Sequence, residues 1–175
     1  MKLSKLAPIC KGCHSIYIRD QLHGGTLTQW AGDGAAFYSL DGMPVFSPET
    51  LFVALGFDID KKDCWILGQE PMNESILNAE MTDGSDAEMN FDQKASLMMK
   101  GKEIIIGYAA GKAYFFNWKY FTPLKMDENF SAVIRKVGAN EILVTKDGMF
   151  PTAMIAPLKL QDDFKSWLEN LLKKM

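Results

Sequence analysis

Residues 9–18, ICKGCHSIYI, contain the pattern Cys-x-x-Cys-His, formed by Cys10, Cys13 and His14. Three chemistries use residues of these types at this spacing. They are covalent haem attachment through two thiols and an axial imidazole, one half of a structural zinc site, and a redox dithiol. Each of them needs further residues, or a particular local structure, that the rest of the chain must supply.

The rest of the sequence supplies little of what these three chemistries need. Haem of this type is attached outside the cytoplasm, and the first ten residues, MKLSKLAPIC, lack the apolar stretch of a secretory signal. Zinc needs four ligands, and beyond the pair of cysteines only His14, His23 and Cys64 remain. A redox dithiol is activated at a helix N-terminus, whereas the following HSIYIRD alternates as a strand does. We therefore place Cys10 and Cys13 in or beside an edge strand and expect no cofactor, with metal and redox sites as the less favoured alternatives.

No other group of residues is typical of a catalytic centre. Acyl transfer needs a nucleophile with a base in reach, and the only histidines are His14 and His23. The sequence contains no Gly-x-Ser-x-Gly motif and neither of the glycine-rich patterns that hold nucleotide phosphates. Acidic residues cluster in a segment that resembles a loop, where precise preorganisation of a carboxylate pair is not expected. We predict that the protein is not an enzyme.

The elements that must position these residues are mainly strands. Alternating apolar residues predict a strand over 15–20 and two further strands between 26 and 40, hinged at Gly32 and Gly34. Later apolar runs separated by turn residues predict strands at 97–99, 104–106, 114–116, 130–137, 141–150 and 151–160.

Helices are predicted at few places. Ser47 is a good N-cap, Pro48 suits the first turn and Gly56 is a natural stop, so a short helix is expected between them. A brief helix is expected at 117–124. Segment 162–175 is predicted to be an amphipathic helix, because one face carries Phe164, Trp167, Leu168, Leu171 and Leu172. Together these patterns indicate an α+β fold with an antiparallel sheet in a single domain, residues 1–175.

Charge is distributed unevenly along the chain. The net charge is -3, but residues 58–93 carry 2 basic and 10 acidic side chains, while residues 94–175 carry 13 and 8. We interpret 58–93 as an acidic excursion from the domain. Its carboxylates are candidate contacts with a partner protein, namely Glu74, Glu80, Asp83, Asp86 and Glu88.

Aromatic residues are concentrated in residues 114–121, YFFNWKYF. Adjacent aromatic side chains cannot all face one side of a sheet, so some of them must point outward. If they do, Trp118 and Tyr120 would stack on single-stranded nucleic acid while Lys112, Lys119 and Lys125 neutralise its phosphates. The alternative, which burial statistics favour, is a core strand that runs into a helix packed against it.

Between residues 114 and 160 the elements follow a definite order. A strand ends at Phe116-Asn117, a short helix contains Lys119-Tyr120-Phe121, and three strands follow, the last of which ends in Pro157-Leu158-Lys159-Leu160. This order is similar to that of the last domain of the bacterial DNA polymerase sliding clamp. Residues 30–40 and 47–56 would supply the other half of such a domain. The chain departs from a clamp in its terminal helix, its acidic excursion and its single domain, since bacterial clamps have three domains per chain.

A second resemblance rests on the pattern W-x-x-D-G-x-A-x-Y-x-L-x-G-x-P, which runs from Trp30 to Pro44. The chain resembles in this respect proteins carried by phages and mobile elements of gut bacteria. The clamp resemblance implies a non-enzymatic scaffold that contacts DNA phosphates without base readout and assembles as a homo-oligomer, and the second resemblance implies that it belongs to a phage or mobile element.

Two other functions stay open at this point. One is a phage-encoded protein that binds a host or phage protein through its acidic segment. The other is an enzyme or metal protein built on Cys10, Cys13, His14 and Cys64. No segment has the 18 or so consecutive apolar residues of a membrane span, so we expect a cytoplasmic protein that does not bind a membrane. The acidic segment and the aromatic residues lead us to expect a protein partner, with DNA and self-association as further possibilities.

Overall fold

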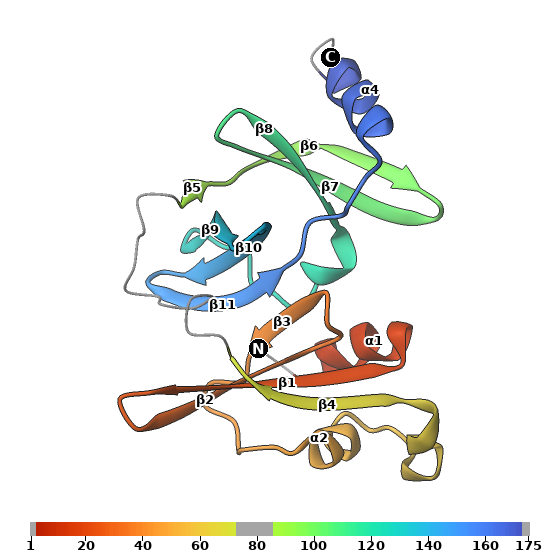
Figure 1. Cartoon of the computed structure of the whole chain (residues 1–175), viewed down its shortest axis with the longest axis vertical. Coiled ribbons are helices and arrows are strands. Elements are labelled where there is room, and N and C mark those ends of the chain that lie inside the picture. Colours follow the sequence, from red (N-terminus) through yellow and green to blue (C-terminus); the bar gives the residue numbers. More distant parts are fainter. Residues whose placement is uncertain (1–2, 73–85, 173–175) are drawn as a thin grey trace.

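The computed structural model describes residues 3–72 and 86–172 of the chain (Figure 1). Up to residue 72 the elements are, in chain order, α1 (Leu3–Cys13), β1 (Ser15–His23), β2 (Thr26–Gly32), β3 (Ala36–Ser39), α2 (Pro48–Ala54), the 3₁₀ helix η1 (Ile59–Cys64) and β4 (Ile66–Pro71).

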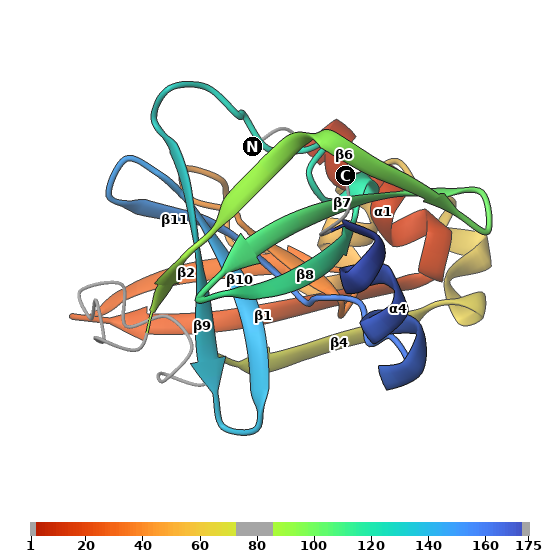
Figure 2. The ribbon, with the colours of Figure 1, turned by 90° about the horizontal axis from the view of Figure 1, so that it is seen from above.

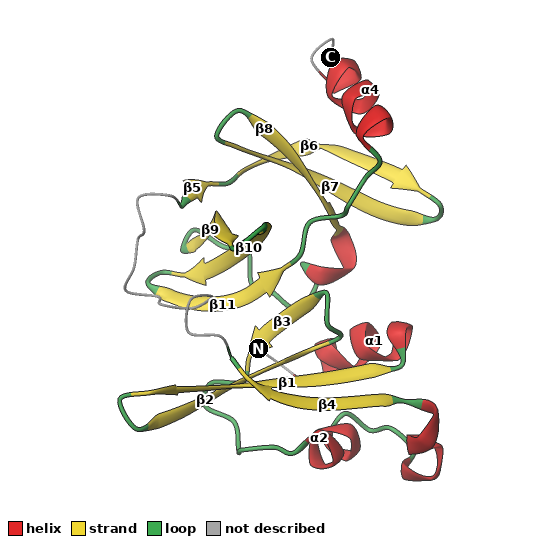
Figure 3. Ribbon diagram, viewed as in Figure 1, coloured by secondary structure: helices red, strands yellow, loops and turns green. Residues whose placement is uncertain are grey.

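After residue 85 strands dominate again, as the colouring by secondary structure in Figure 3 shows. The elements of this part are β5 (Ala87–Glu88), β6 (Asn90–Met99), β7 (Lys102–Ala109), β8 (Lys112–Asn117), the 3₁₀ helix η2 (Trp118–Tyr120), β9 (Phe130–Val137), β10 (Asn140–Asp147), β11 (Phe150–Ile155) and α4 (Asp162–Leu172).

The described strands form two sheets. The larger has eight strands in the order β4-β1-β2-β3-β11-β10-β9-β5, and the smaller has three in the order β6-β7-β8. The pairing of β3 with β11, in which Ala36 lies opposite Ile155, joins the two halves of the chain into one sheet. This sheet twists strongly, as sheets of L-residues do, so that β9 and β10 run across the direction of β1 and β4 in Figure 2.

The main core lies on one face of the large sheet. From the sheet, Ile16, Ile18 and Tyr38 point into it, and α1 contributes Leu6 while α2 contributes Phe52. The same core contains Phe116 of β8 and Phe121, so the small sheet also packs against it. The other side of the small sheet carries Ile104, Ile106 and Phe115, on which Leu168 of α4 is buried. The terminal helix therefore lies at the opposite end of the molecule from α2 (Figure 1).

The predicted α+β fold with an antiparallel sheet and few short helices is confirmed. Among the described strand pairs only β1 and β4 run parallel. Helix α2 forms where its caps predicted it, with Ser47 and Thr50 in a reciprocal capping box and Pro48 in the first turn. The brief helix expected at 117–124 is a single 3₁₀ turn, η2. Helix α4 forms as predicted over its described length.

Helix α1 is the main element that the sequence patterns missed. The prediction that Cys10 and Cys13 lie in or beside an edge strand is wrong, because both cysteines lie near the C-terminal end of α1. The following strand, β1, is an interior strand between β2 and β4. Pro8 and Gly12 lower the helix propensity of this segment, so burial of its apolar residues against the sheet must stabilise the helix.

The stretch interpreted as an acidic excursion contributes to the sheet at both of its ends. Strand β4 pairs with β1 over six residues, and β5 pairs with β9. The weak periodicity of β4 follows from its position at the sheet edge, where most of its side chains are exposed. In the described parts of the chain, no helix has the length and apolar character needed to cross a membrane.

Candidate functional site

The turn between β2 and β3 buries a carboxylate, that of Asp33. Its Oδ1 accepts hydrogen bonds from the backbone N–H groups of Ala35, at 3.0 Å, and Ala36, at 3.1 Å, which closes the turn. The turn is tight, since a Cβ on Gly32 would lie 1.6 Å from the carbonyl oxygen of Ala36, and Gly34 has a φ of 95°. The glycines on either side of Asp33 thus allow its side chain to point into the molecule.

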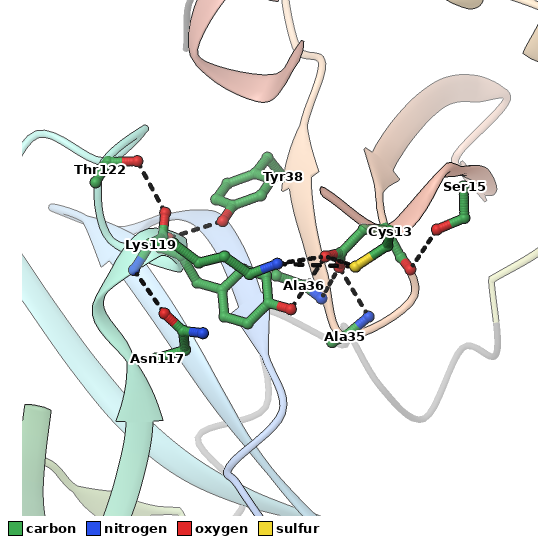
Figure 4. Close-up of polar contacts among 10 residues, drawn as sticks. Cys13, Ser15, Ala35, Ala36, Tyr38, Asn117, Lys119 and Thr122 are labelled. Carbon is green, nitrogen blue, oxygen red and sulfur yellow. Dashed lines mark hydrogen bonds and ion pairs between the residues drawn. The ribbon is translucent and has the colours of Figure 1, made fainter. Parts of the chain in front are cut away.

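The second oxygen of this carboxylate collects side chains from distant parts of the chain (Figure 4). Asp33 Oδ2 lies 3.0 Å from the hydroxyl of Tyr120, 3.2 Å from Nζ of Lys119 and 3.4 Å from Sγ of Cys13. The Asp33 side chain has no exposed surface, while that of Lys119 is 35% exposed. We call Cys13, Asp33, Tyr38, Lys119 and Tyr120 the Asp33 junction, because they link α1, the β2–β3 turn and η2.

The geometry of η2 holds the two residues that reach Asp33. Asn117 caps the 3₁₀ turn by accepting from the N–H of Lys119 at 3.1 Å, and Thr122 donates to the Lys119 carbonyl at 2.8 Å. Tyr38 donates its hydroxyl proton to the carbonyl of Tyr120 at 2.7 Å. The Lys119 ammonium also lies 4.4 Å from the centre of the Tyr120 ring, a cation–π distance.

The electrostatics of the Asp33 junction keep its proton donors protonated. Burial raises the pKa of Cys10 to about 12, and the partial burial of the Cys13 sulfur raises the pKa of that thiol as well; in both cases the Asp33 charge is the second cause. The same two causes raise the pKa of Tyr120 to about 12. Partial burial alone would lower the pKa of Lys119, but its contacts with Tyr120 and Asp33 outweigh burial and raise it. Neither the thiol nor the amine is therefore an activated nucleophile at neutral pH.

The structure separates the three residues of the Cys-x-x-Cys-His pattern. Cys10 is buried in the main core, Cys13 is exposed and donates to Asp33, and the ring of His14 packs edge-on against Trp65 at 5.2 Å. Within residues 3–72 and 86–172, no three histidine, cysteine, aspartate or glutamate side chains are grouped so that they could hold a metal ion. The pattern thus contributes one member, Cys13, to the Asp33 junction.

Of the candidate nucleic-acid contacts, each lysine has a carboxylate neighbour. Lys112 lies 3.6 Å from Glu141, Lys119 pairs with Asp33, and Lys125 pairs with Asp127. The two aromatic candidates differ in exposure, and Tyr120 is only 7% exposed. The ring of Trp118 stacks on Phe121 at 6.0 Å, with a third of its surface exposed. The structure brings Lys119 and Tyr120 together around Asp33, and nucleic-acid binding at these residues stays a prediction.

The candidate acidic contacts divide into three groups. Asp86 is buried in a bidentate ion pair with Arg135, in which both side chains are 6% exposed. Glu88 is exposed on β5. The remaining three, Glu74, Glu80 and Asp83, lie outside the described residues. Asp86 therefore has a structural role in holding β5 to β9.

A cavity of about 420 Å³ lies on the face of the large sheet opposite the main core. Strand alternation produces it, because Ala36 and Tyr38 enter the core while Phe37, between them, faces the other way. Its apolar lining includes Phe37, Met72, Ile142 and Met154, and its charged lining is Arg19 and Glu70. We call these six residues together with Ala156 the outer groove.

The outer groove was not foreseen from the sequence, although one signal pointed to it. Residues 36–38 (AFY) and 153–155 (AMI) are apolar without interruption, which is typical of strands that are covered on both faces. The distant partners of these residues are Met72 at the end of β4 and Arg19 on β1, which only the sheet order brings to the same face.

Comparison of the chain with protein-family models, with curated proteins and with solved structures finds no match.

Proposed function

We propose that the protein is a non-catalytic binding protein that holds an apolar segment of a partner protein in the outer groove. The observation that carries this proposal is a mainly apolar lining, including Met72 and Met154, on a sheet face where no described helix covers it. Its volume of about 420 Å³ is large enough for several apolar side chains. Binding would remove the partly exposed side chains of Phe37 and Ile142 from water, while the buried methionines Met72 and Met154 behind them can adapt their shape to a partner.

The Asp33 junction supports binding in preference to catalysis. Its carboxylate already accepts from five donors, those of Ala35, Ala36, Tyr120, Lys119 and Cys13. Its thiol is held in the protonated form by burial and by the Asp33 charge, which raise its pKa. A carboxylate so fully engaged has little capacity left to accept a proton from a substrate. We assign the junction the role of fixing α1 and η2 to the sheet.

A clamp-like scaffold on DNA, assembled from several copies and belonging to a phage or mobile element, stays a proposal that rests on the sequence resemblance. A groove for a partner protein is compatible with that scaffold, because a scaffold must also recruit proteins. Contact with DNA through Lys112, Lys119 and Lys125 would require these side chains to exchange their carboxylate neighbours for phosphates. The outer groove does not depend on any of them.

The proposed function is tested by selecting displayed random heptapeptides on the immobilised full chain. Two variants obstruct the groove without changing the main core: Ala156→Trp fills it from an exposed position, and Ile142→Lys places a charge on its half-buried wall. Met149→Lys, at a site 87% exposed and outside the groove, is the matched control. We expect peptides rich in large apolar residues that bind the wild type and the control but not the two groove variants.

Two outcomes would contradict the proposal. One is that no peptide is enriched on the wild type. The other is that the selected peptides bind Ala156→Trp and Ile142→Lys as well as they bind the wild type. Thermal unfolding of all variants establishes that a loss of binding does not come from a loss of the fold.

A further inference from the structure

Arg19 occupies a distinctive position at the rim of the outer groove. It follows Ile18, which is buried in the main core, so strand alternation directs its side chain to the groove face. Its guanidinium carbon lies 5.6 Å from the centre of the Phe37 ring, and Nη1 donates to Glu70, which lies opposite Arg19 in the β1–β4 register. The Phe37 ring beneath the guanidinium restricts the orientation of its plane.

Among the described residues, Arg19 uses little of its hydrogen-bonding capacity. Its acceptor there is Glu70, which Nη1 reaches, and Nε and Nη2 donate to no described group. The side chain is 30% exposed, and Glu70 is 64% exposed. An exposed ion pair of this kind contributes little free energy, so Glu70 is easily displaced by a competing carboxylate.

We propose that Arg19 binds a carboxylate of the partner segment and that this selects partners with an aspartate or glutamate side chain beside their apolar residues. A planar carboxylate matches the fork of guanidinium N–H groups, which a single oxygen of Glu70 does not fill. No element of residues 3–72 and 86–172 blocks the groove beyond Arg19, so a chain can continue past it, which favours an acidic side chain within the segment over a terminal carboxylate. This inference rests on the proposed function of the outer groove.

The test extends the heptapeptide selection to variants of the rim. The displayed peptides are fused at their C-termini, so any carboxylate near the groove comes from a side chain. We expect aspartate and glutamate to be enriched among peptides selected on the wild type, and this enrichment to disappear on Arg19→Gln. It should persist or increase on Glu70→Gln, since a competing internal carboxylate is then absent. Lys11→Gln, which removes an exposed positive charge from α1, is the matched control for net charge.

A selected peptide, synthesised with an amidated C-terminus, then measures the pairing directly. Replacing its acidic residue by the corresponding amide should weaken binding to the wild type by about tenfold or more, as expected for a charge-assisted hydrogen bond. The same replacement should have little effect on binding to Arg19→Gln, and Arg19→Lys should restore only part of the selectivity because it keeps the charge without the fork.

The outcomes separate this inference from the function on which it rests. Peptides that depend on the groove residues but show no acidic enrichment would overturn the role of Arg19 and leave the binding function standing. Acidic enrichment that persists on Arg19→Gln would do the same. If no peptide depends on the groove residues, both proposals fail. A free peptide that binds only with an unblocked C-terminus would assign the carboxylate to a chain terminus and contradict the inference as stated.

Discussion

The carboxylate of Asp33 and the ammonium of Lys119 lie 3.2 Å apart, although 86 residues separate them in the chain. Asp33 is fixed by its own turn, and Lys119 is fixed by the Asn117 cap of η2. The contact therefore joins two locally ordered units, one from each half of the chain. This ion pair and the pairing of β3 with β11 both hold the N-terminal half of the chain to the C-terminal half.

Removing the Asp33 side chain should destabilise the fold more than removing the Lys119 charge. Asp33→Ala leaves the buried Tyr120 hydroxyl and two turn N–H groups without their acceptor, which should cost about 2–4 kcal/mol. Lys119→Met leaves four donors on the carboxylate, and the lost ammonium was partly exposed, so the expected cost is about 1 kcal/mol. Urea denaturation measures both free energies of unfolding, and the reverse order would show that the ion pair dominates the junction.

Stability should fall at alkaline pH because of Tyr120. Its pKa is about 12 in the folded protein, against an ordinary value of 10.0, so the unfolded chain loses the phenolic proton first. The stabilising contribution is fully present below pH 10 and is lost as the pH rises toward 12. The raised pKa of Lys119 acts in the same direction.

The measurement is the urea midpoint between pH 8 and pH 12 for the wild type and for Tyr120→Phe. The variant should be less stable at pH 8 by about 1 kcal/mol, since Asp33 loses one donor, and should lose less stability above pH 10. Parallel curves for the two proteins would show that Tyr120 does not titrate as its surroundings require.

The three thiols should differ in their rates of alkylation, because burial and the Asp33 charge act on Cys10 and Cys13. Cys10 is buried and its pKa is about 12, so it should be protected in the native protein. Cys13 is exposed, but its raised pKa should displace the pH dependence of its alkylation upward. Asp33→Asn removes a negative charge beside the thiol and should accelerate Cys13 alkylation several-fold at pH 8.

Mass spectrometry of alkylated peptides follows all three sites at once, with exposed Cys64 as the internal reference. Continued protection of Cys10 in Asp33→Asn establishes that the variant is folded. An unchanged ratio of Cys13 to Cys64 rates would refute the influence of Asp33 on the thiol.

Asp86 should be far more important for stability than its neighbour Glu88. Asp86→Ala removes the carboxylate that pairs with the Arg135 guanidinium, and both of these side chains are only 6% exposed. Breaking such a buried pair costs about 3–5 kcal/mol. Glu88→Ala removes an exposed carboxylate two residues away and should change stability by no more than about 0.5 kcal/mol.

A double variant separates the loss of a buried charge partner from the loss of packing. Asp86→Leu combined with Arg135→Met places apolar side chains in the same space and should recover much of the stability lost in Asp86→Ala. The comparison is made by thermal unfolding. Equal effects of Asp86→Ala and Glu88→Ala would mean that the ion pair does not form in solution.

The elements that could be predicted from sequence are those with a local cause. Helix α2 follows from Ser47, Pro48 and the apolar residues between its caps, and α4 from its 3.6-residue periodicity. Strands β9, β10 and β11 follow from apolar runs separated by turn residues. Neighbouring residues are sufficient in each case, since capping, hairpin turns and helical amphipathicity act over a few residues.

Helix α1 and strand β4 could not be predicted because their causes are distant. Pro8 and Gly12 disfavour the helix locally, and burial of Leu6, Ile9 and Cys10 against the sheet stabilises it. Strand β4 is largely exposed and has little pattern of its own, so its structure comes from backbone pairing with β1. The Cys-x-x-Cys-His pattern was assigned to a strand because the alternation of apolar residues begins just after it. That alternation belongs to β1, which follows the pattern, whereas Cys10 and Cys13 lie in α1.

The sequence by itself determined that the chain would form an antiparallel sheet with few helices, because strand and turn patterns are local. Only the tertiary structure decided which chemical groups meet. Asp33 lies in a turn that sequence reveals, but its partners Lys119 and Tyr120 come from the other half of the chain, which the pairing of β3 with β11 joins to the first, and Cys13 comes from α1. Arg19, Phe37 and Met154 likewise share the outer groove because strand order, which no local interaction specifies, brings three separate strands to one face.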